Sequence, residues 1–167
     1  MGDRLTKGDV EKIKAEIEHR KVVVRKEAIE AVKEARAHGD LSENFEYHAA
    51  KKDKNRNESR IRYLERMLKN ATIIEDNTAS DEVGLNNKVT VFFEDDQVEE
   101  EYKIVTSVRG NSLKGLISIE SPIGRALVGK KTGDRVYVKV NDDVGYYVVI
   151  KNISEDLGED SDEIKKY

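Results

Sequence analysis

The segment HGDLSENFEYHAA, residues 38–50, places three carboxylates in and just after a short glycine-containing turn: Asp40, Glu43 and Glu46. Solvated carboxylates are ionised at neutral pH, and two or three oxygens at this spacing can contact one hard cation such as Mg²⁺. They are too few to hold the ion alone. The segment therefore predicts a Mg²⁺ site that is completed by ligands from a partner.

The same residues also have a simpler interpretation as helix punctuation. Gly39 can adopt the left-handed conformation that ends a helix. Asp40 can cap the following helix, and Glu43 three residues later can complete a box-like cap. Acidic side chains in a first helical turn also complement the helix dipole. At the level of the residues, capping and cation binding both remain open.

Two helical stretches must position this turn. Before it, apolar residues recur at steps of three and four, with a gap at Arg20: Val10, Ile13, Ile17, Val24, Ala28, Ala31 and Ala35. After it, the pattern continues through Leu41, Phe45, Ile61, Leu64 and Leu68, with polar Lys54 and Asn57 at expected seam positions. This near-heptad period predicts an antiparallel coiled-coil hairpin over residues 1–75, with its acidic tip at 38–46. Each arm would reach about 45 Å at 1.5 Å per residue.

The second half changes to the alternating, β-branched pattern of strands at 88–93, 101–108, 116–120, 135–140 and 146–153. Pro122 at a first helical position predicts one short helix, and Gly129 is a plausible stop. The predicted fold class is α+β, with a small, mostly antiparallel sheet domain at 76–154. Residues 155–167 are acidic and lack an apolar period, which predicts a disordered tail.

The overall composition narrows the class of protein. Of 167 residues, 37% are hydrophobic and 38% are charged, which favours an elongated body over one thick core. The net charge of −4 gives no global basic field for duplex DNA, and the absence of cysteine excludes disulfides and thiolate metal sites. No stretch is apolar enough to span a membrane or form a signal peptide. These features predict an intracellular, cytoplasmic protein with no membrane contact.

Residues 51–69 are rich in Lys and Arg, and Lys52, Arg56 and Arg60 follow one another at steps of four. They are expected on one side of the second helix, away from the apolar seam. One interpretation is a solvated helix face. The other is a patch that binds an RNA backbone through salt-dependent phosphate contacts, without reading sequence.

Three motifs, GDLSENFEYHAAK, RIRYLERML and SPIGRALVGKKTGD, occur in this order. With them the chain resembles, over residues 5–153, the Gre family of bacterial transcript-cleavage elongation factors, of the GreA and GreB type. The resemblance implies that the hairpin enters the secondary channel of RNA polymerase. It also implies that the second domain, similar to the FK506-binding-protein fold, docks at the channel mouth. The polymerase would then cut the 3′ end of backtracked RNA. Within the family, the sequence SENFEYHAAK is more similar to the GreA type than to the GreB type.

The resemblance assigns roles to individual residues. Asp40 and Glu43 match the tip acids that help to hold a Mg²⁺ shared with the polymerase, and Ser42 would add a hydroxyl. The protein would thus be no enzyme itself and would have no cofactor of its own. Asn44, Glu46 and Tyr47 would shape the tip. Lys52, Arg56 and Arg60 would contact the 3′ end of the nascent RNA.

The motif SPIGRALVG supplies the expected polymerase-docking residues Ser121, Pro122, Ile123 and Arg125. Two residues depart from the family's common form. Phe45 stands where a small residue is usual. Gly124 stands where alanine is usual, which is expected to loosen the start of the short helix by up to about 1 kcal/mol.

Alternatives remain beside a monomeric cleavage factor. One is a regulator of the same shape that binds the channel without stimulating cleavage. The bulky Phe45 just behind the tip is compatible with this alternative. A prolyl isomerase is suggested only by analogy of fold. A coiled-coil adaptor or chaperone would explain the hairpin but not its pairing with SPIGRALVG. The histidines His19, His38 and His48 form no metal-ligand pattern.

Overall fold

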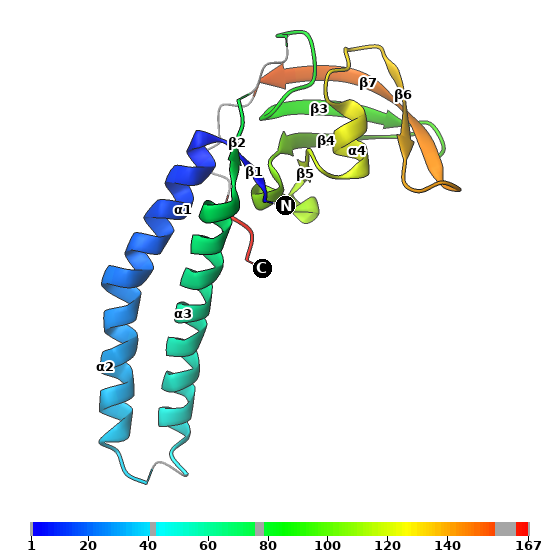
Figure 1. Cartoon of the computed structure of the whole chain (residues 1–167). Coiled ribbons are helices and arrows are strands. Elements are labelled where there is room, and N and C mark those ends of the chain that lie inside the picture. The colour runs from blue at the N-terminus through cyan, green and yellow to red at the C-terminus, as the bar shows by residue number, and fades with distance from the viewer. Residues whose placement is uncertain (1, 41–42, 76–78, 156–162, 167) are drawn as a thin grey trace. The chain divides into compact units, whose positions relative to one another are not determined.

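The structure is a computed structural model, which describes residues 2–40, 43–75, 79–155 and 163–166. Two compact units are present (Figure 1). A helical unit is built mainly from Val10–Ala71, and a sheet unit combines Asp3–Asp9 with Thr72–Tyr167. The α+β class is confirmed. Within the described ranges, no helix combines the length and apolar composition that crossing a membrane requires.

The helical unit is an antiparallel hairpin. Its first arm runs through α1 (Lys7–His19), a π-helical turn (Arg20–Val24) and α2 (Arg25–Arg36), and its second arm is α3 (Phe45–Asn70). Residues 10–36 and 45–70 contain neither glycine nor proline. These stretches therefore lack the residues that most strongly disfavour a helix interior, and Gly8 lies in the first turn of α1.

The predicted seam is largely confirmed. Its predicted apolar residues Ile13, Ala35, Ile61 and Leu64 are buried, and Asn57 is buried in its polar middle. Leu68 is only half-buried, and its neighbour Met67, which was not predicted, is buried. Two positions are wrong: Ala31 is exposed while its neighbour Val32 is half-buried, and Phe45 is 85% exposed. The π turn explains the first error, because one extra residue in a turn rotates the rest of the helix by about 100°. Leu41 lies outside the described residues.

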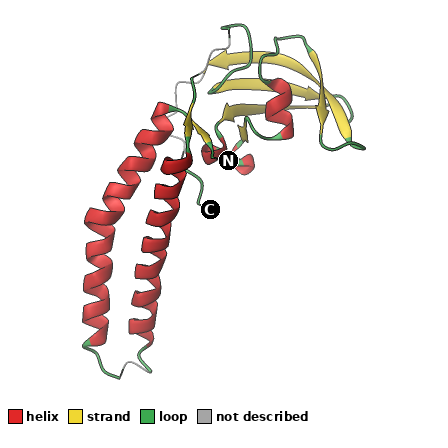
Figure 2. Ribbon diagram, viewed as in Figure 1, coloured by secondary structure: helices red, strands yellow, loops and turns green. Residues whose placement is uncertain are grey.

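The sheet unit contains a five-stranded mixed sheet in the order β5-β4-β3-β7-β6 (Figure 2). The strands are β3 (Asn87–Phe93), β4 (Val98–Val105), β5 (Leu116–Ser118), β6 (Arg135–Lys139) and β7 (Gly145–Glu155). Only the β4–β5 pair is parallel among the pairs of this sheet. The five predicted strands are confirmed, with shifted ends: the second ends at Val105, and a 3₁₀ turn (Ser107–Arg109) follows it.

Alternation explains the core of this sheet. Val89 and Val91 of β3, and Val148 and Ile150 of β7, are fully buried on one face. The short helix α4 (Pro122–Leu127) contributes Leu127 to the same cluster. Its predicted start and stop are confirmed: Ser121 caps it, and Gly129 follows its end with a φ of +84°.

Further elements of the sheet unit escaped sequence reasoning. The strands β1 (Arg4–Leu5) and β2 (Thr72–Ile73) pair in parallel, and each is too short to show a period. A second 3₁₀ turn covers Ser112–Lys114. Residues 163–166 belong to this unit, where the Lys165 N–H donates to the Val108 carbonyl oxygen at 2.6 Å.

A buried ionic cluster also holds the sheet unit together. The Asp9 Oδ1 and Arg109 Nε atoms lie 2.6 Å apart, and both side chains are fully buried. Thr106 donates its hydroxyl to Asp9 Oδ2 at 2.6 Å. Thr6 and Asp9 also exchange two 3.1 Å backbone-to-side-chain hydrogen bonds, which form a capping box at the start of α1.

Candidate functional site

The loop between α2 and α3 (Figure 1) carries two of the three carboxylates that the sequence singles out, and the third, Glu46, lies in the first turn of α3. Asp40 and Glu43 are both exposed. Ser42 lies outside the described residues. Gly39 has a φ of +133°, which favours glycine as predicted, but α2 already ends at Arg36 with Ala37 as its C-cap, so Gly39 shapes the loop and does not end the helix.

Asn44 connects the two arms at this tip. Its side-chain Oδ1 accepts a hydrogen bond from the Tyr47 N–H at 3.0 Å, which makes Asn44 the N-cap of α3. Its Nδ2 donates to the Ala35 carbonyl oxygen near the end of α2 at 2.6 Å. One amide therefore satisfies a donor at the start of one helix and an acceptor at the end of the other.

The prediction that Asp40 caps α3, with Glu43 completing the cap, is wrong. The helix begins at Phe45, after both residues. An amide can accept and donate at once, whereas an ionised carboxylate can only accept. Asn44 thus makes both contacts, and the cap leaves the Asp40 and Glu43 carboxylates in the loop that precedes the helix.

Two further contacts join the end of the first arm, at Arg36 and at His38 just beyond α2, to the first turn of α3. The His38 Nδ1 and Glu46 Oε2 atoms lie 2.9 Å apart. The Arg36 guanidinium lies over the Tyr47 ring, 5.6 Å from its centroid. Both pairs span the loop, so they hold its two ends together while Asp40 and Glu43 remain exposed between them.

The residues fit a shared metal ion but not a self-sufficient site. No group of three or more His, Cys, Asp or Glu side chains suited to a metal ion occurs in the described part of the chain. Asp40 and Glu43 offer carboxylate oxygens, the ligands that Mg²⁺ prefers. Because Mg²⁺ is octahedral, this pair would leave most positions to water or to another molecule.

The three basic residues expected on one face do not lie together. Lys52 and Arg56 are exposed, and Arg56 lies 3.9 Å from Asp53. Arg60 is only 7% exposed, and its Nε lies 2.9 Å from Glu16 Oε2 on the other arm. The expected position of Arg60 is therefore wrong. A four-residue step advances about 40° around a helix, so two steps turn Arg60 toward the seam.

The electrostatics of Glu16 reflect this pairing. Burial raises the pKa of the Glu16 carboxyl, but hydrogen bonds and charge from Arg60 and Arg20 outweigh burial and hold the pKa below its usual value. Arg60 and Arg20 thus neutralise a half-buried acid inside the hairpin. In this structure Arg60 serves the hairpin and not a solvated surface.

The expected docking residues surround the start of α4 in the sheet unit. Ser121 Oγ accepts from the Gly124 N–H at 3.1 Å and donates to the Ser118 carbonyl oxygen at 2.7 Å. Pro122 and Ile123 are half-buried, and Ile123 packs against the core, whereas Arg125 is exposed. Arg125 is thus the most accessible of the four.

Gly124 has a role in addition to the one expected. A Cβ atom at this position would collide with the Ser118 carbonyl oxygen. The helix therefore approaches the backbone after β5 more closely than any other residue type allows. The packing of α4 therefore depends on the missing side chain, and the expected loosening of the helix start stays a prediction.

Comparison with known proteins agrees with this two-unit organisation. Residues 4–73 match the family described as "Transcription elongation factor, N-terminal", and residues 77–155 match "Transcription elongation factor, GreA/GreB, C-term". A protein of Magnetococcus marinus named "Transcription elongation factor GreA" is 41% identical, over 88% of this chain and 94% of the relative. A protein of Staphylococcus saprophyticus with the same name is 44% identical, over 89% and 94%.

Solved structures also resemble the chain. A crystal structure of "GreA factor homolog 1 (Gfh1) protein of Thermus thermophilus" is 27% identical with a TM-score of 0.43, over 92% of this chain and 99% of that one. The two matched domains and the curated relatives define the class of protein as a transcription elongation factor. More specifically, the chain belongs to the GreA/GreB family.

Proposed function

We propose that this elongation factor binds bacterial RNA polymerase through its secondary channel and stimulates the polymerase's own cleavage of the 3′ end of backtracked RNA. Arrested complexes would thereby resume elongation. The observation that carries the proposal is the exposure of Asp40 and Glu43 together on the loop at the end of the hairpin. Carboxylates so placed can enter another protein's active site while the arms remain folded.

In this proposal the chain is not an enzyme, because it supplies ligands to a site that the polymerase owns. Asp40 and Glu43 would hold a Mg²⁺ shared with the polymerase, and Ser42 would add a hydroxyl. Such an ion, when bound, lowers the pKa of a water and stabilises a leaving oxygen. Asn44 supports both carboxylates by tying the arms together beside them.

The remaining surfaces have proposed partners as well. Ser121, Pro122, Ile123 and Arg125 would dock on the polymerase at the mouth of the channel. Lys52 and Arg56 would contact the RNA backbone, whereas Arg60 is committed to Glu16. The factor would act as a monomer in the bacterial cytoplasm, with no cofactor of its own.

The test is cleavage of 3′-labelled RNA in a stalled, backtracked bacterial polymerase complex with Mg²⁺. Wild type is expected to release short 3′ fragments. The double variant Asp40→Ala/Glu43→Ala is expected to bind the polymerase without doing so. Glu27→Ala/Glu30→Ala is the matched control, since it removes two exposed carboxylates from α2 away from the tip. Equal loss of cleavage in both variants would contradict a role specific to the tip.

A second function is favoured by Phe45, whose ring is 85% exposed at the first residue of α3. A bulky apolar side chain directly behind the tip could alter its fit in the channel. The protein would then regulate the polymerase without stimulating cleavage. Wild type that binds but releases no fragments, with cleavage appearing on Phe45→Ala, would support this function over the first.

A further inference from the structure

The first arm of the hairpin contains a π-helical turn at Arg20–Val24. The Arg25 N–H donates to the Arg20 carbonyl oxygen, five residues back, whereas in an α-helix it would donate to Lys21. The segment RKVVV contains no glycine or proline that would force this geometry. Because π turns are rare and are found mostly as single-turn insertions in α-helices, the surroundings must hold this one in place.

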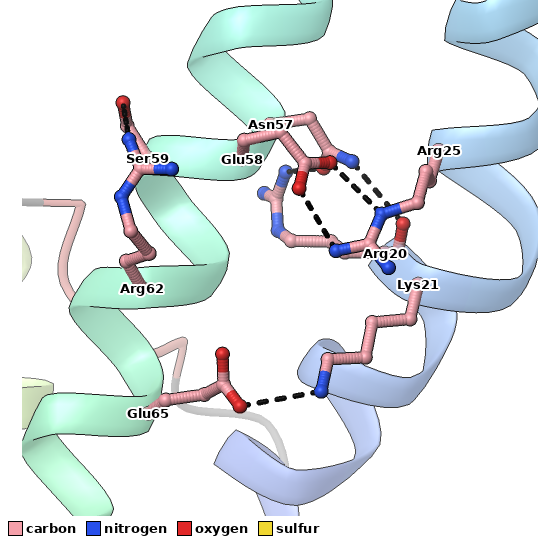
Figure 3. A network of polar contacts seen from close by, with 8 residues as sticks. All are labelled: Arg20, Lys21, Arg25, Asn57, Glu58, Ser59, Arg62 and Glu65. Carbon is pink, nitrogen blue, oxygen red and sulfur yellow. Dashed lines mark hydrogen bonds and ion pairs between the residues drawn. The ribbon is translucent and has the colours of Figure 1, made fainter.

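Asn57 on the opposite arm provides that hold (Figure 3). Its Nδ2 donates to the Arg20 carbonyl oxygen at 3.1 Å, and its Oδ1 accepts from Arg20 Nη1 at 3.1 Å. The Arg20 carbonyl oxygen therefore receives two donors, one from each arm. Asn57 is 4% exposed, so its amide is buried and fully committed to this one residue.

Neighbouring ion pairs reinforce the same level of the hairpin. Glu16 accepts from Arg20 Nε at 2.7 Å as well as from Arg60. On the far side of the turn, Arg25 makes a bidentate pair with Glu58, with both distances 2.9 Å. The Glu16–Arg60 and Arg25–Glu58 pairs thus link the two arms on either side of the π turn.

The π turn changes which side chains of α2 face the other arm. The three-and-four spacing of the sequence groups Ala31 with Ala28 and Ala35. The structure instead exposes Ala31, half-buries Val32 and buries Ala35. Continued through an unbroken α-helix, the spacing of Val10, Ile13 and Ile17 would bring positions 24, 27, 31 and 34 to the seam. One extra residue, a rotation of about 100°, moves these to 25, 28, 32 and 35, which are the positions of α2 that are half-buried or buried. The sequence thus offers an apolar residue for either phase of α2, and the structure adopts the phase that the π turn sets.

We propose that Asn57 is a positioning residue for the tip: by holding the π turn, it sets the rotational phase of α2 and so the direction in which the tip residues face. The structural part concerns the hairpin alone. Its consequence for RNA cleavage rests on the proposed function. A displacement of about 1 Å can lower the rate of a positioned reaction about a hundredfold, so a rotation of α2 would be costly.

Thiol accessibility tests the structural part directly, because the chain contains no cysteine. Ala31→Cys and Val32→Cys are made separately and labelled with a charged, water-soluble thiol reagent. In the parent, position 31 is expected to label faster than position 32. Asn57→Leu removes both amide contacts, and the isosteric Asn57→Asp removes only the donation to Arg20. In both backgrounds the order of the two rates is expected to reverse.

Asn55→Leu and Asn55→Asp are the matched controls, since Asn55 is exposed on the same helix. They are expected to keep the parent order. Far-UV circular dichroism verifies that each variant remains helical, and if Asn57→Leu unfolds, Asn57→Asp carries the test. An unchanged order of rates in a folded Asn57 variant would show that Asn57 does not hold the phase.

Cleavage then tests the positioning role. Asn57→Asp is expected to lower fragment release by at least about tenfold, in keeping with the sensitivity of positioned reactions, while polymerase binding stays at the parent level. Reversed labelling with unchanged cleavage would overturn the positioning role and leave the structural part standing. If the parent itself stimulates no cleavage, the proposed function fails, and the labelling result still decides whether Asn57 holds the π turn.

Discussion

The hairpin and the sheet unit bury different kinds of side chain. The sheet core is a continuous apolar cluster that includes Val89, Val91, Val148 and Ile150, all fully buried. The hairpin seam is apolar only in part, and its middle is occupied by Arg60, Asn57 and their partners. Apolar contacts stabilise without direction, whereas buried polar groups stabilise only the arrangement that pairs them. The buried polar pairs therefore favour one particular arrangement of the two arms of the hairpin, whereas the apolar core mainly stabilises the sheet unit.

The largest effect on stability is expected from breaking the Asp9–Arg109 ion pair, because it buries two charges in an otherwise mainly apolar sheet unit. Arg109→Met would leave Asp9 buried without its cation and lower the free energy of unfolding by about 3–5 kcal/mol. Denaturant unfolding followed by tyrosine fluorescence measures this. The double variant Asp9→Leu/Arg109→Met should be less destabilised than the single one; a larger loss in the double would contradict the uncompensated charge as the cause.

The apolar core itself should be nearly as sensitive. Ile150→Ala removes a fully buried side chain from β7 and is expected to lower the free energy of unfolding by about 2–5 kcal/mol, through lost burial and a cavity. Val140→Ala is the control, since Val140 is 49% exposed and should change stability by less than about 0.5 kcal/mol. Similar effects at both positions would mean that the sheet core is loosely packed.

A smaller effect on stability is expected at the tip, where the single side chain of Asn44 hydrogen-bonds to both arms. Asn44→Ala removes the cap of α3 and should cost about 1 kcal/mol of hairpin stability. Hydrogen exchange at the Tyr47 amide should speed up accordingly. Asn44→Asp keeps the acceptor for Tyr47 but loses the donation to Ala35. Full protection of Tyr47 in the alanine variant would show that the cap is dispensable.

The smallest effect concerns pH and the polar seam. The pKa of Glu16 is below its usual value in the folded hairpin, because burial raises it by less than Arg60 and Arg20 lower it. Its contribution to stability is therefore present above the unfolded value of about 4.3 and is lost as pH falls through the lower folded value. Thermal unfolding between pH 6 and pH 3, about the range of this titration, should show a weaker acid dependence in Glu16→Gln. Glu18→Gln, on the exposed face of α1, should leave the dependence unchanged.

Much of the architecture could be predicted because it depends on local periods. The alternation in residues 88–93 and 146–153 predicted β3 and β7, since every second side chain of a strand faces the same side. Pro122 after Ser121 marked the start of α4 for an equally local reason. The acidic loop between two helical stretches was also visible, and the structure exposes both Asp40 and Glu43 on it.

Other features depended on partners far along the chain. The order of residues alone does not say that Arg60 faces Glu16, 44 residues away, or that Asp9 pairs with Arg109. The choice of Asn44 over Asp40 as the cap required the Ala35 carbonyl oxygen to be within reach. In each case the polar side chain could also have been solvated, and its role was determined by a partner that is distant in the sequence and close in the fold.

The seam shows the division between sequence and tertiary structure most clearly. By itself the sequence determined that two helices would form and that small apolar residues would line α2, because those outcomes depend on propensity and period. The spacing predicted Ala31 at an inward position of α2 and did not single out Val32. The tertiary structure decided for Val32, because the Arg20 carbonyl oxygen meets the Asn57 amide across the hairpin and the resulting π turn rotates all of α2.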